Sequence, residues 1–137
     1  MGVNIAEKLR YQTDLEVNQL AFQAAMQIFK VTKTFPKEET YSLTDQIRQS
    51  SRSVCANLSE AWRRRRYQAA FINNLNYVEA EAAETQVWLS SSKECGYYSD
   101  QESNELIQTY NHIIGITIQM IKHHENWVIN HKTSRKK

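Results

Sequence analysis

Apolar residues recur at intervals of three and four in four separate stretches of the sequence, and this spacing constrains the fold more than any other feature. The first stripe consists of Val17, Ala21, Ala24, Ile28, Val31 and Phe35. The second consists of Ile47, Ser51, Val54, Leu58 and Ala61. The third consists of Phe71, Leu75, Val78, Ala82, Thr85 and Leu89, and the fourth of Leu106, Tyr110, Ile113, Thr117, Ile121, His124 and Val128. Since this spacing places each set on one face of a helix, we predict four amphipathic helices.

Local signals predict where the helices begin. Ser42 followed three residues later by Asp45 resembles a capping box with Asp in place of Glu, which places a helix start near Leu43. Ser99 and Glu102 form a second such pair and predict the start of the fourth helix.

Other signals predict where the helices end. Pro36 disfavours helical geometry at Phe35 and should interrupt the first pattern there. The second helix should end around the arginine run 63–66, and Gly96 is the residue type favoured just past the end of the third.

Four amphipathic helices with three short connections predict an all-α fold, an antiparallel up-down-up-down four-helix bundle. The chain contains only three glycines and one proline, which argues against a strand-and-turn fold. We expect the bundle to occupy residues 15–131, with an N-terminal extension at 1–14 and a basic tail at 132–137.

A segment rich in isoleucine in the fourth stretch suggests that the bundle self-associates. On a helix, its large apolar side chains cover an arc of about 200°, wider than the roughly 100° that one core-facing stripe needs. These side chains are Ile113, Ile114, Ile116, Ile118, Met120 and Ile121. Trp62, Trp88 and Trp127 also lie at or beside the inward stripes. We therefore predict a homo-oligomer that covers the surplus apolar surface.

Charge is segmented along the chain although the formal net charge is only +2. Residues 1–66 hold 11 basic and 7 acidic side chains, residues 67–131 hold 2 and 8, and the tail 132–137 adds four basic ones. The small net charge does not by itself require a polyanionic partner. Whether the protein has one must therefore be inferred from the positions of the basic residues.

The sharpest electrostatic feature is the run Arg63, Arg64, Arg65 and Arg66, followed by Tyr67. Side chains splayed around a helix end can contact phosphates, and a tyrosine can stack on a base. Arg48 and Arg52 lie one turn apart on the same predicted helix and would extend this basic surface. We predict that these seven residues bind nucleic acid.

The alternative is that the same arginines have a structural role and bind no nucleic acid. Cations at a helix C-terminus stabilise its dipole, and they can pair with Glu79, Glu81 or Glu94 of neighbouring helices.

Asn57, Glu60 and Glu84 are polar residues close to inward positions, and we predict that they form a structural polar network. The rival is a carboxylate-bridged metal pair in which His123 or His124 joins glutamates such as Glu81. That type of site needs Glu-x-x-His on two helices, a spacing the sequence lacks, so we expect no metal and no other cofactor.

No enzyme motif is present, neither a glycine-rich phosphate loop, nor GxSxG, nor HExxH, and we expect no catalysis. Cys55 and Cys95 are too few for a disulfide framework and are expected to be reduced. The sequence shows no signal peptide and no apolar run long enough to span a bilayer, which predicts a cytoplasmic protein with no membrane partner.

Several short motifs resemble the 23S ribosomal RNA intervening-sequence family of four-helix-bundle proteins. They are FPKEE at 35–39, LTDQIR at 43–48, SVxANxxE at 53–60 and AETQ at 83–86. The resemblance implies a ring-shaped homo-oligomer, commonly a pentamer. A related branch, the accessory variability determinant of diversity-generating retroelements, partners a reverse transcriptase and binds nucleic acid through a basic surface.

Together, the residues and the resemblance predict a non-catalytic oligomer that binds RNA, DNA or a nucleic-acid enzyme such as a reverse transcriptase. The alternative is a structural or protein-interaction scaffold with no affinity for nucleic acid.

Overall fold

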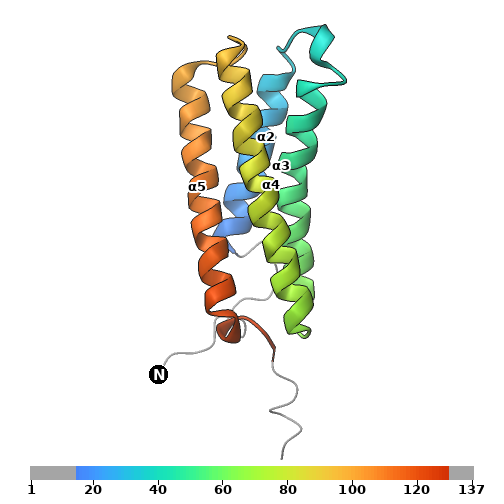
Figure 1. The fold of residues 1–137 in the computed structure, drawn as a ribbon, viewed down its shortest axis with the longest axis vertical. Helices are drawn as coiled ribbons and strands as arrows, with labels where there is room; N and C mark the ends of the chain where they lie inside the picture. The colour runs from blue at the N-terminus through green and yellow to red at the C-terminus, as the bar shows by residue number, and fades with distance from the viewer. Residues whose placement is uncertain (1–14, 130–137) are drawn as a thin grey trace, which may run out of the picture.

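The computed structural model describes residues 15–129, and within them the chain forms four α-helices and no strand (Figure 1). The helices are α2 (Glu16–Thr32), α3 (Leu43–Arg63), α4 (Gln68–Glu94) and α5 (Asp100–Lys122). Two short 3-10 helices, η2 (Lys37–Glu39) and η3 (His124–Asn126), precede α3 and follow α5. The expected extension at 1–14 and the basic tail at 132–137 lie outside the described residues. The all-α prediction is confirmed for this part of the chain.

Each helix packs against two others, so the four surround a single core. α3 contacts α2 and α4, whereas α5 contacts α4 and α2. Figure 1 shows the connections at residues 33–42 and 95–99 at one end of the molecule and the connection at 64–67 at the other. The connection at 64–67 is the one that carries Arg64, Arg65 and Arg66.

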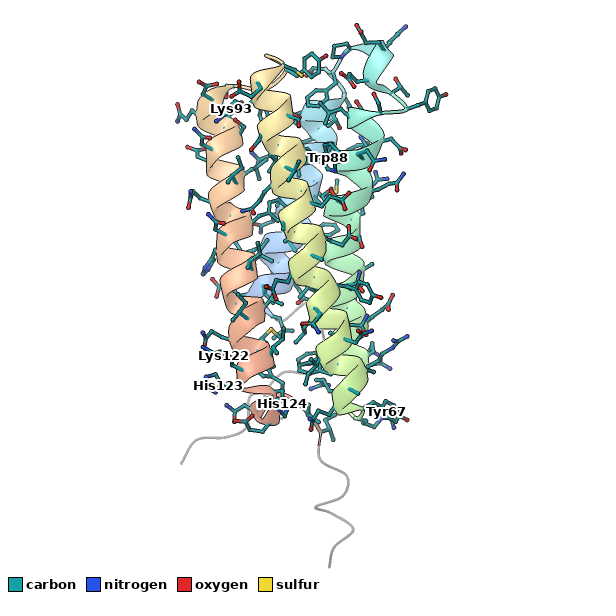
Figure 2. The ribbon with its side chains drawn as sticks, viewed as in Figure 1. Tyr67, Trp88, Lys93, Lys122, His123 and His124 are labelled. Carbon is teal, nitrogen blue, oxygen red and sulfur yellow. The ribbon has the colours of Figure 1, made fainter. Side chains whose placement is uncertain are left out.

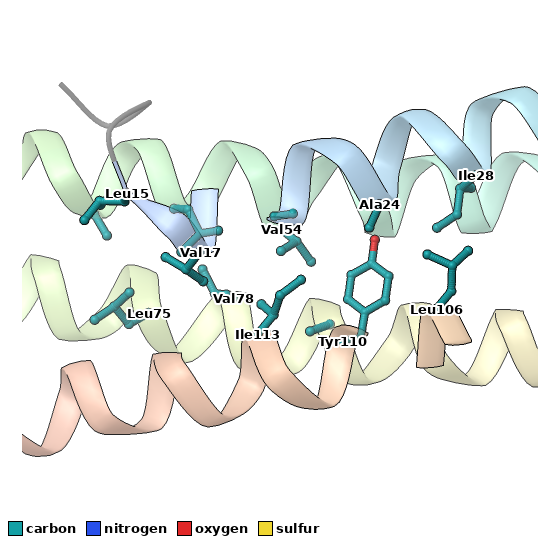
Figure 3. Packing of buried hydrophobic residues seen from close by; sticks show 14 of the residues in the cluster. Leu15, Val17, Ala24, Ile28, Val54, Leu75, Val78, Leu106, Tyr110 and Ile113 are labelled. Carbon is teal, nitrogen blue, oxygen red and sulfur yellow. The ribbon is translucent and has the colours of Figure 1, made fainter. Parts of the chain in front are cut away.

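The core follows the predicted stripes closely. Figure 3 shows side chains from α2, α3, α4 and α5 meeting along the axis. The fully buried aliphatic and aromatic side chains include Ile28, Ile47, Val54, Trp62, Phe71, Leu75, Leu89, Tyr110 and Ile113. Three-four spacing therefore identified the buried face of every helix, because a helical turn of 3.6 residues returns these positions to the same side.

The two predicted helix starts have different outcomes. Ser99 caps α5 as expected, since its hydroxyl accepts a hydrogen bond from the Glu102 backbone N–H at 3.1 Å. Ser42 precedes α3 as expected, but its hydroxyl makes no cap and instead donates to Glu39 Oε1 at 2.6 Å. The same Glu39 oxygen accepts from the Leu43 N–H at 3.2 Å. A carboxylate three residues upstream thus takes the role assigned to Ser42 and Asp45.

The end of α4 is the one the sequence marks most clearly. Gly96 has φ +77°, the left-handed conformation that glycine adopts without steric cost. The Tyr97 N–H donates to the Ser92 carbonyl at 2.9 Å and the Gly96 N–H to the Lys93 carbonyl at 3.0 Å. This pair of bonds is the Schellman motif, which satisfies the last carbonyls of the helix.

Two other helices end earlier than their stripes suggest. α2 stops at Thr32, before Phe35, and Arg48 bonds to its last turn through Thr32 Oγ1 at 2.8 Å and the Phe29 carbonyl at 3.4 Å. α5 stops at Lys122, so the prediction that His124 and Val128 continue the helix is wrong. The chain turns there through η3.

The isoleucine-rich segment does not carry the surplus apolar surface expected of it. Ile113 and Met120 are buried, while Ile114, Ile116 and Ile121 pack partly buried against the core. Ile118 is half-buried. The exposed large hydrophobic side chains of the described residues lie elsewhere, at Phe22, Met26, Tyr41, Tyr67, Tyr77, Val87 and Ile129. The broad arc is accommodated because α5 packs against both α2 and α4.

Candidate nucleic-acid interface

The arginine run lies where α3 ends and the chain turns into α4. Arg63 is the last residue of α3, and Arg64 to Arg66 form the turn, so the four arginines do not continue one helix face. Tyr67 follows and is 61% exposed. Figure 2 shows Tyr67 at the same end of the bundle as Lys122, His123 and His124. We call Arg63 to Arg66 and Tyr67 the bundle-end group.

Arg65 is engaged within the chain. Its guanidinium carbon lies 3.6 Å from the centre of the buried Trp62 ring, and its Nε donates to the Trp62 carbonyl at 2.7 Å. Burial, and secondarily the charge of Arg63, lower the pKa of Arg65. The Arg65 carbonyl also accepts from the Ile129 N–H at 2.9 Å. This backbone hydrogen bond connects the segment after α5 to the turn between α3 and α4.

Arg64 belongs to a polar network around Asn74, which is only 4% exposed. Its Nη1 donates to Asn74 Oδ1 at 3.3 Å, and its Nη2 lies 3.9 Å from Glu60 Oε1. The Asn74 amide donates to Asn57 Oδ1 and to Glu60 Oε1, both at 3.1 Å. Asn57 and Glu60 are thus brought together, as predicted, but through a residue that the sequence analysis missed.

The signal for Asn74 was present, because it lies three residues after Phe71 and therefore near the inward stripe of α4. Glu84 does not join the network. It accepts a hydrogen bond from the Trp88 indole N–H at 3.1 Å. The prediction that Glu84 shares the network with Asn57 and Glu60 is wrong, because Glu84 lies ten residues beyond Asn74 on α4, a rise of about 15 Å.

Arg63, Arg64 and Arg66 are exposed, and since Arg64 bonds to Asn74, Arg63 and Arg66 are the exposed cations that lie outside the polar network. The Arg66 guanidinium carbon lies 5.8 Å from the centre of the Tyr67 ring. An arginine beside an exposed tyrosine offers a phosphate contact and a stacking surface together.

A second cationic cluster surrounds the Phe29 ring at the junction of α2 and α3. Lys33 Nζ and the Arg48 guanidinium carbon each lie 4.8 Å from the ring centre, and the Arg52 guanidinium carbon lies 5.7 Å from it. None of these three cations forms an ion pair with a carboxylate of residues 15–129. We call Phe29, Lys33, Arg48 and Arg52 the lateral group.

The two groups are separate surfaces. Arg48 lies 15 residues before Arg63 on α3, a rise of about 22 Å. The expectation that Arg48 and Arg52 continue the patch formed by the arginine run is therefore corrected to two cationic sites. Phe29 and Lys33 were not predicted as part of a site. The sequence does show that Phe29 and Lys33 are four residues apart, as are Arg48 and Arg52, so each pair lies on one helix face.

Two other kinds of site, a metal centre and a membrane span, have no candidate in the described part of the chain. No group of three or more His, Cys, Asp or Glu side chains there could hold a metal ion. None of the helices from α2 to α5 combines the length and the apolar character needed to cross a bilayer.

Comparison with known proteins places this architecture in a family. Residues 13–119 match the family described as 23S rRNA-intervening sequence protein. The chain belongs to this family. A crystal structure of a Bacteroides thetaiotaomicron protein of unknown function, from the S23 ribosomal protein family, is similar to it with a TM-score of 0.70 and 28% sequence identity. The match covers 77% of this chain and 95% of that chain. No curated protein matches the chain.

Proposed function

We propose that this 23S rRNA-intervening sequence family member is a non-catalytic, self-associating protein of the cytoplasm that binds nucleic acid through its lateral and bundle-end groups. The observation that carries the proposal is the lateral group, in which three cations gather around one ring with no carboxylate partner.

Clustering like charges without a counter-charge is unfavourable in isolation, and a bound polyanion relieves that repulsion. The aromatic contacts also hold the three side chains in place before binding, which reduces the conformational entropy lost with the ligand. Phosphate oxygens provide the complementary charge, and they make up most of the contacts of proteins with nucleic acid. The exposed Tyr67 adds a stacking surface for an unpaired base.

The assembly part of the proposal is an antiparallel up-down-up-down bundle that forms a ring of copies. The antiparallel order is supported by connections that lie at alternate ends of the molecule (Figure 1). The ring, and a pentamer in particular, is supported by the family resemblance. A ring would repeat both cationic groups around its axis and multiply weak phosphate contacts. RNA, DNA or a reverse transcriptase carrying either would then be the partner.

Salt-dependent binding to fluorescent RNA and single-stranded DNA tests this function. Replacing Lys33 and Arg52 by alanine removes two exposed cations but keeps Arg48, which bonds to the end of α2. We expect weaker binding and a log-log salt slope reduced by about 1.4, at about 0.7 per lost phosphate contact on a single strand. The matched control replaces Lys37 and Lys93, which changes the net charge equally. Equal slopes for both double variants would reject the lateral group as the binding site.

The second candidate is a protein-interaction scaffold without nucleic-acid affinity. It is favoured by the intramolecular contacts of Arg64 and Arg65, which show that part of the arginine run has a structural role. Under this alternative, neither RNA nor DNA binds at any salt concentration, and replacing Arg63 and Arg66 weakens assembly.

A further inference from the structure

We propose that copies of this chain dock head to tail, with Phe22 and Met26 on α2 of one copy packing along Ala83 and Val87 on α4 of the next. This inference rests on the self-association proposed above and names the surfaces that perform it.

The α2 surface consists of large apolar side chains left in solvent. Phe22 is 61% exposed and Met26 is 39% exposed. They lie four residues apart and therefore on one face, with Lys30 one turn further along. An adjacent exposed phenylalanine and methionine are enriched at interfaces between proteins and unusual on a free surface.

The α4 surface is a shallow groove along the outside of the helix. Ala83, Val87, Ser90 and Ser91 line it, with Glu94 at its far end. Val87 is 56% exposed although Val78, Ala82 and Leu89 already supply the buried face of the same helix. α4 thus has apolar residues on two sides, and small residues in the groove leave room for a phenylalanine.

The two surfaces share a register. α2 ends at Thr32 and α4 at Glu94, and the rings three positions beyond, Phe35 and Tyr97, contact each other at a tilt of 49° with centres 5.4 Å apart. Matching ends place Phe22 within one residue of the level of Ala83, and Met26 within one residue of the level of Val87. In the proposed up-down-up-down order α2 and α4 run in the same direction, so rotation about a ring axis preserves this match.

Charge favours a head-to-tail contact over a symmetric one. Residues 16–67 carry nine basic and five acidic side chains, and residues 68–129 carry two and eight. The contact itself joins α2, which carries one acidic and one basic side chain, to α4, which carries four glutamates and one lysine. Packing α2 of one copy on α4 of another places Lys30 within reach of Glu94 on this acidic helix. A two-fold contact of the α4 surface with itself would bring two acidic helices together. A second copy of this chain is therefore the occupant that the groove fits.

Sedimentation of the full chain provides the first test. Val87→Arg and Phe22→Arg should each raise the subunit dissociation constant by at least about 100-fold, because each buries an unpaired charge in the contact. Tyr41→Arg, at an exposed loop position, is the matched control and should leave assembly unchanged. Circular dichroism checks that every variant remains helical.

Disulfide trapping under mild oxidation tests the register in a Cys95→Ser background. Met26→Cys mixed with Val87→Cys should give a cross-linked dimer, while each variant alone should give none. Cross-linking of either variant alone would overturn the head-to-tail arrangement in favour of a two-fold contact. An oligomer unaffected by both arginine variants would overturn this contact and leave self-association standing. A wild-type chain that stays monomeric at all concentrations would overturn self-association itself.

Discussion

Replacing Tyr110 by phenylalanine should stabilise the protein. The Tyr110 side chain is 0% exposed, and its hydroxyl has no hydrogen-bond partner among the described residues. Figure 3 shows the hydroxyl pointing toward Ala24 in the centre of the core. A buried hydroxyl without a partner costs about 1 to 3 kcal/mol, because it loses its hydrogen bonds to water. Phenylalanine removes this cost and retains the ring that fills the core.

The expected gain is about 1 kcal/mol in the free energy of unfolding, since the small space left by the hydroxyl offsets part of the benefit. For a chain of 137 residues, this corresponds to a rise in Tm of roughly 3 °C. Urea denaturation followed by circular dichroism measures the free energy directly.

Tyr98→Phe is the matched control. Tyr98 is also buried, but its hydroxyl accepts a hydrogen bond from the Gln27 amide at 3.2 Å. Removing this hydroxyl should lower stability by about 0.5 to 1.5 kcal/mol, the opposite sign. A Tyr110→Phe variant that is less stable than the wild type would show that the hydroxyl is satisfied, and would refute the reasoning.

The pH dependence supplies an independent check. Burial is the main cause that raises the pKa of Tyr110 above its usual value of 10.0. Because the folded pKa exceeds the unfolded one, the stability contribution is complete below pH 10 and is lost as the pH rises and the unfolded chain ionises. Tyr110→Phe should therefore lose less stability than the wild type between pH 9 and pH 11.

Three further predictions concern the polar network, the thiols and the carboxylate at the start of α3. Asn74→Ala should lower the free energy of unfolding by about 1 to 2 kcal/mol, since it removes the hydrogen bonds from the buried Asn74 amide to Asn57 and to the half-exposed Glu60; a loss below about 0.5 kcal/mol in urea would contradict the network. At pH 8 the exposed Cys95 should react with a thiol reagent well before Cys55, whose pKa is raised to about 11 by burial, and equal rates would contradict this. Hydrogen bonds from Ser42, Tyr97 and Leu43 lower the pKa of Glu39, so the free energy of unfolding of the wild type should fall as the pH drops through 4.5 and lower. In acid denaturation, Glu39→Gln should show a flatter dependence of this free energy on pH.

Local chemistry was sufficient for much of the fold. The stripes from Val17 to Ile113 identified the core, and Gly96 and Ser99 marked the connection between α4 and α5. These features act within one or two helical turns, so a single sequence displays them. The cap at α3 was missed because Glu39, the last residue of η2, reaches it across residues 40–42, a path that depends on how that segment folds.

The candidate site was predicted by residue type more successfully than by arrangement. The arginines were identified from the sequence, but their separate roles depend on neighbours distant along the chain. Arg64 meets Asn74, and Arg48 meets Phe29 together with Lys33, only because α3 packs beside α4 and α2. The expected surplus of apolar surface also moved from α5 to Phe22 and Val87.

The sequence by itself determined four amphipathic helices, their buried faces and a chain that is basic in one half and acidic in the other. Helical periodicity and charge order are properties of neighbouring residues, so they exist before the helices pack. Only the tertiary structure decided which cations remain available to a ligand and which side chains stay in solvent. Those outcomes depend on distances between helices, which no local pattern specifies.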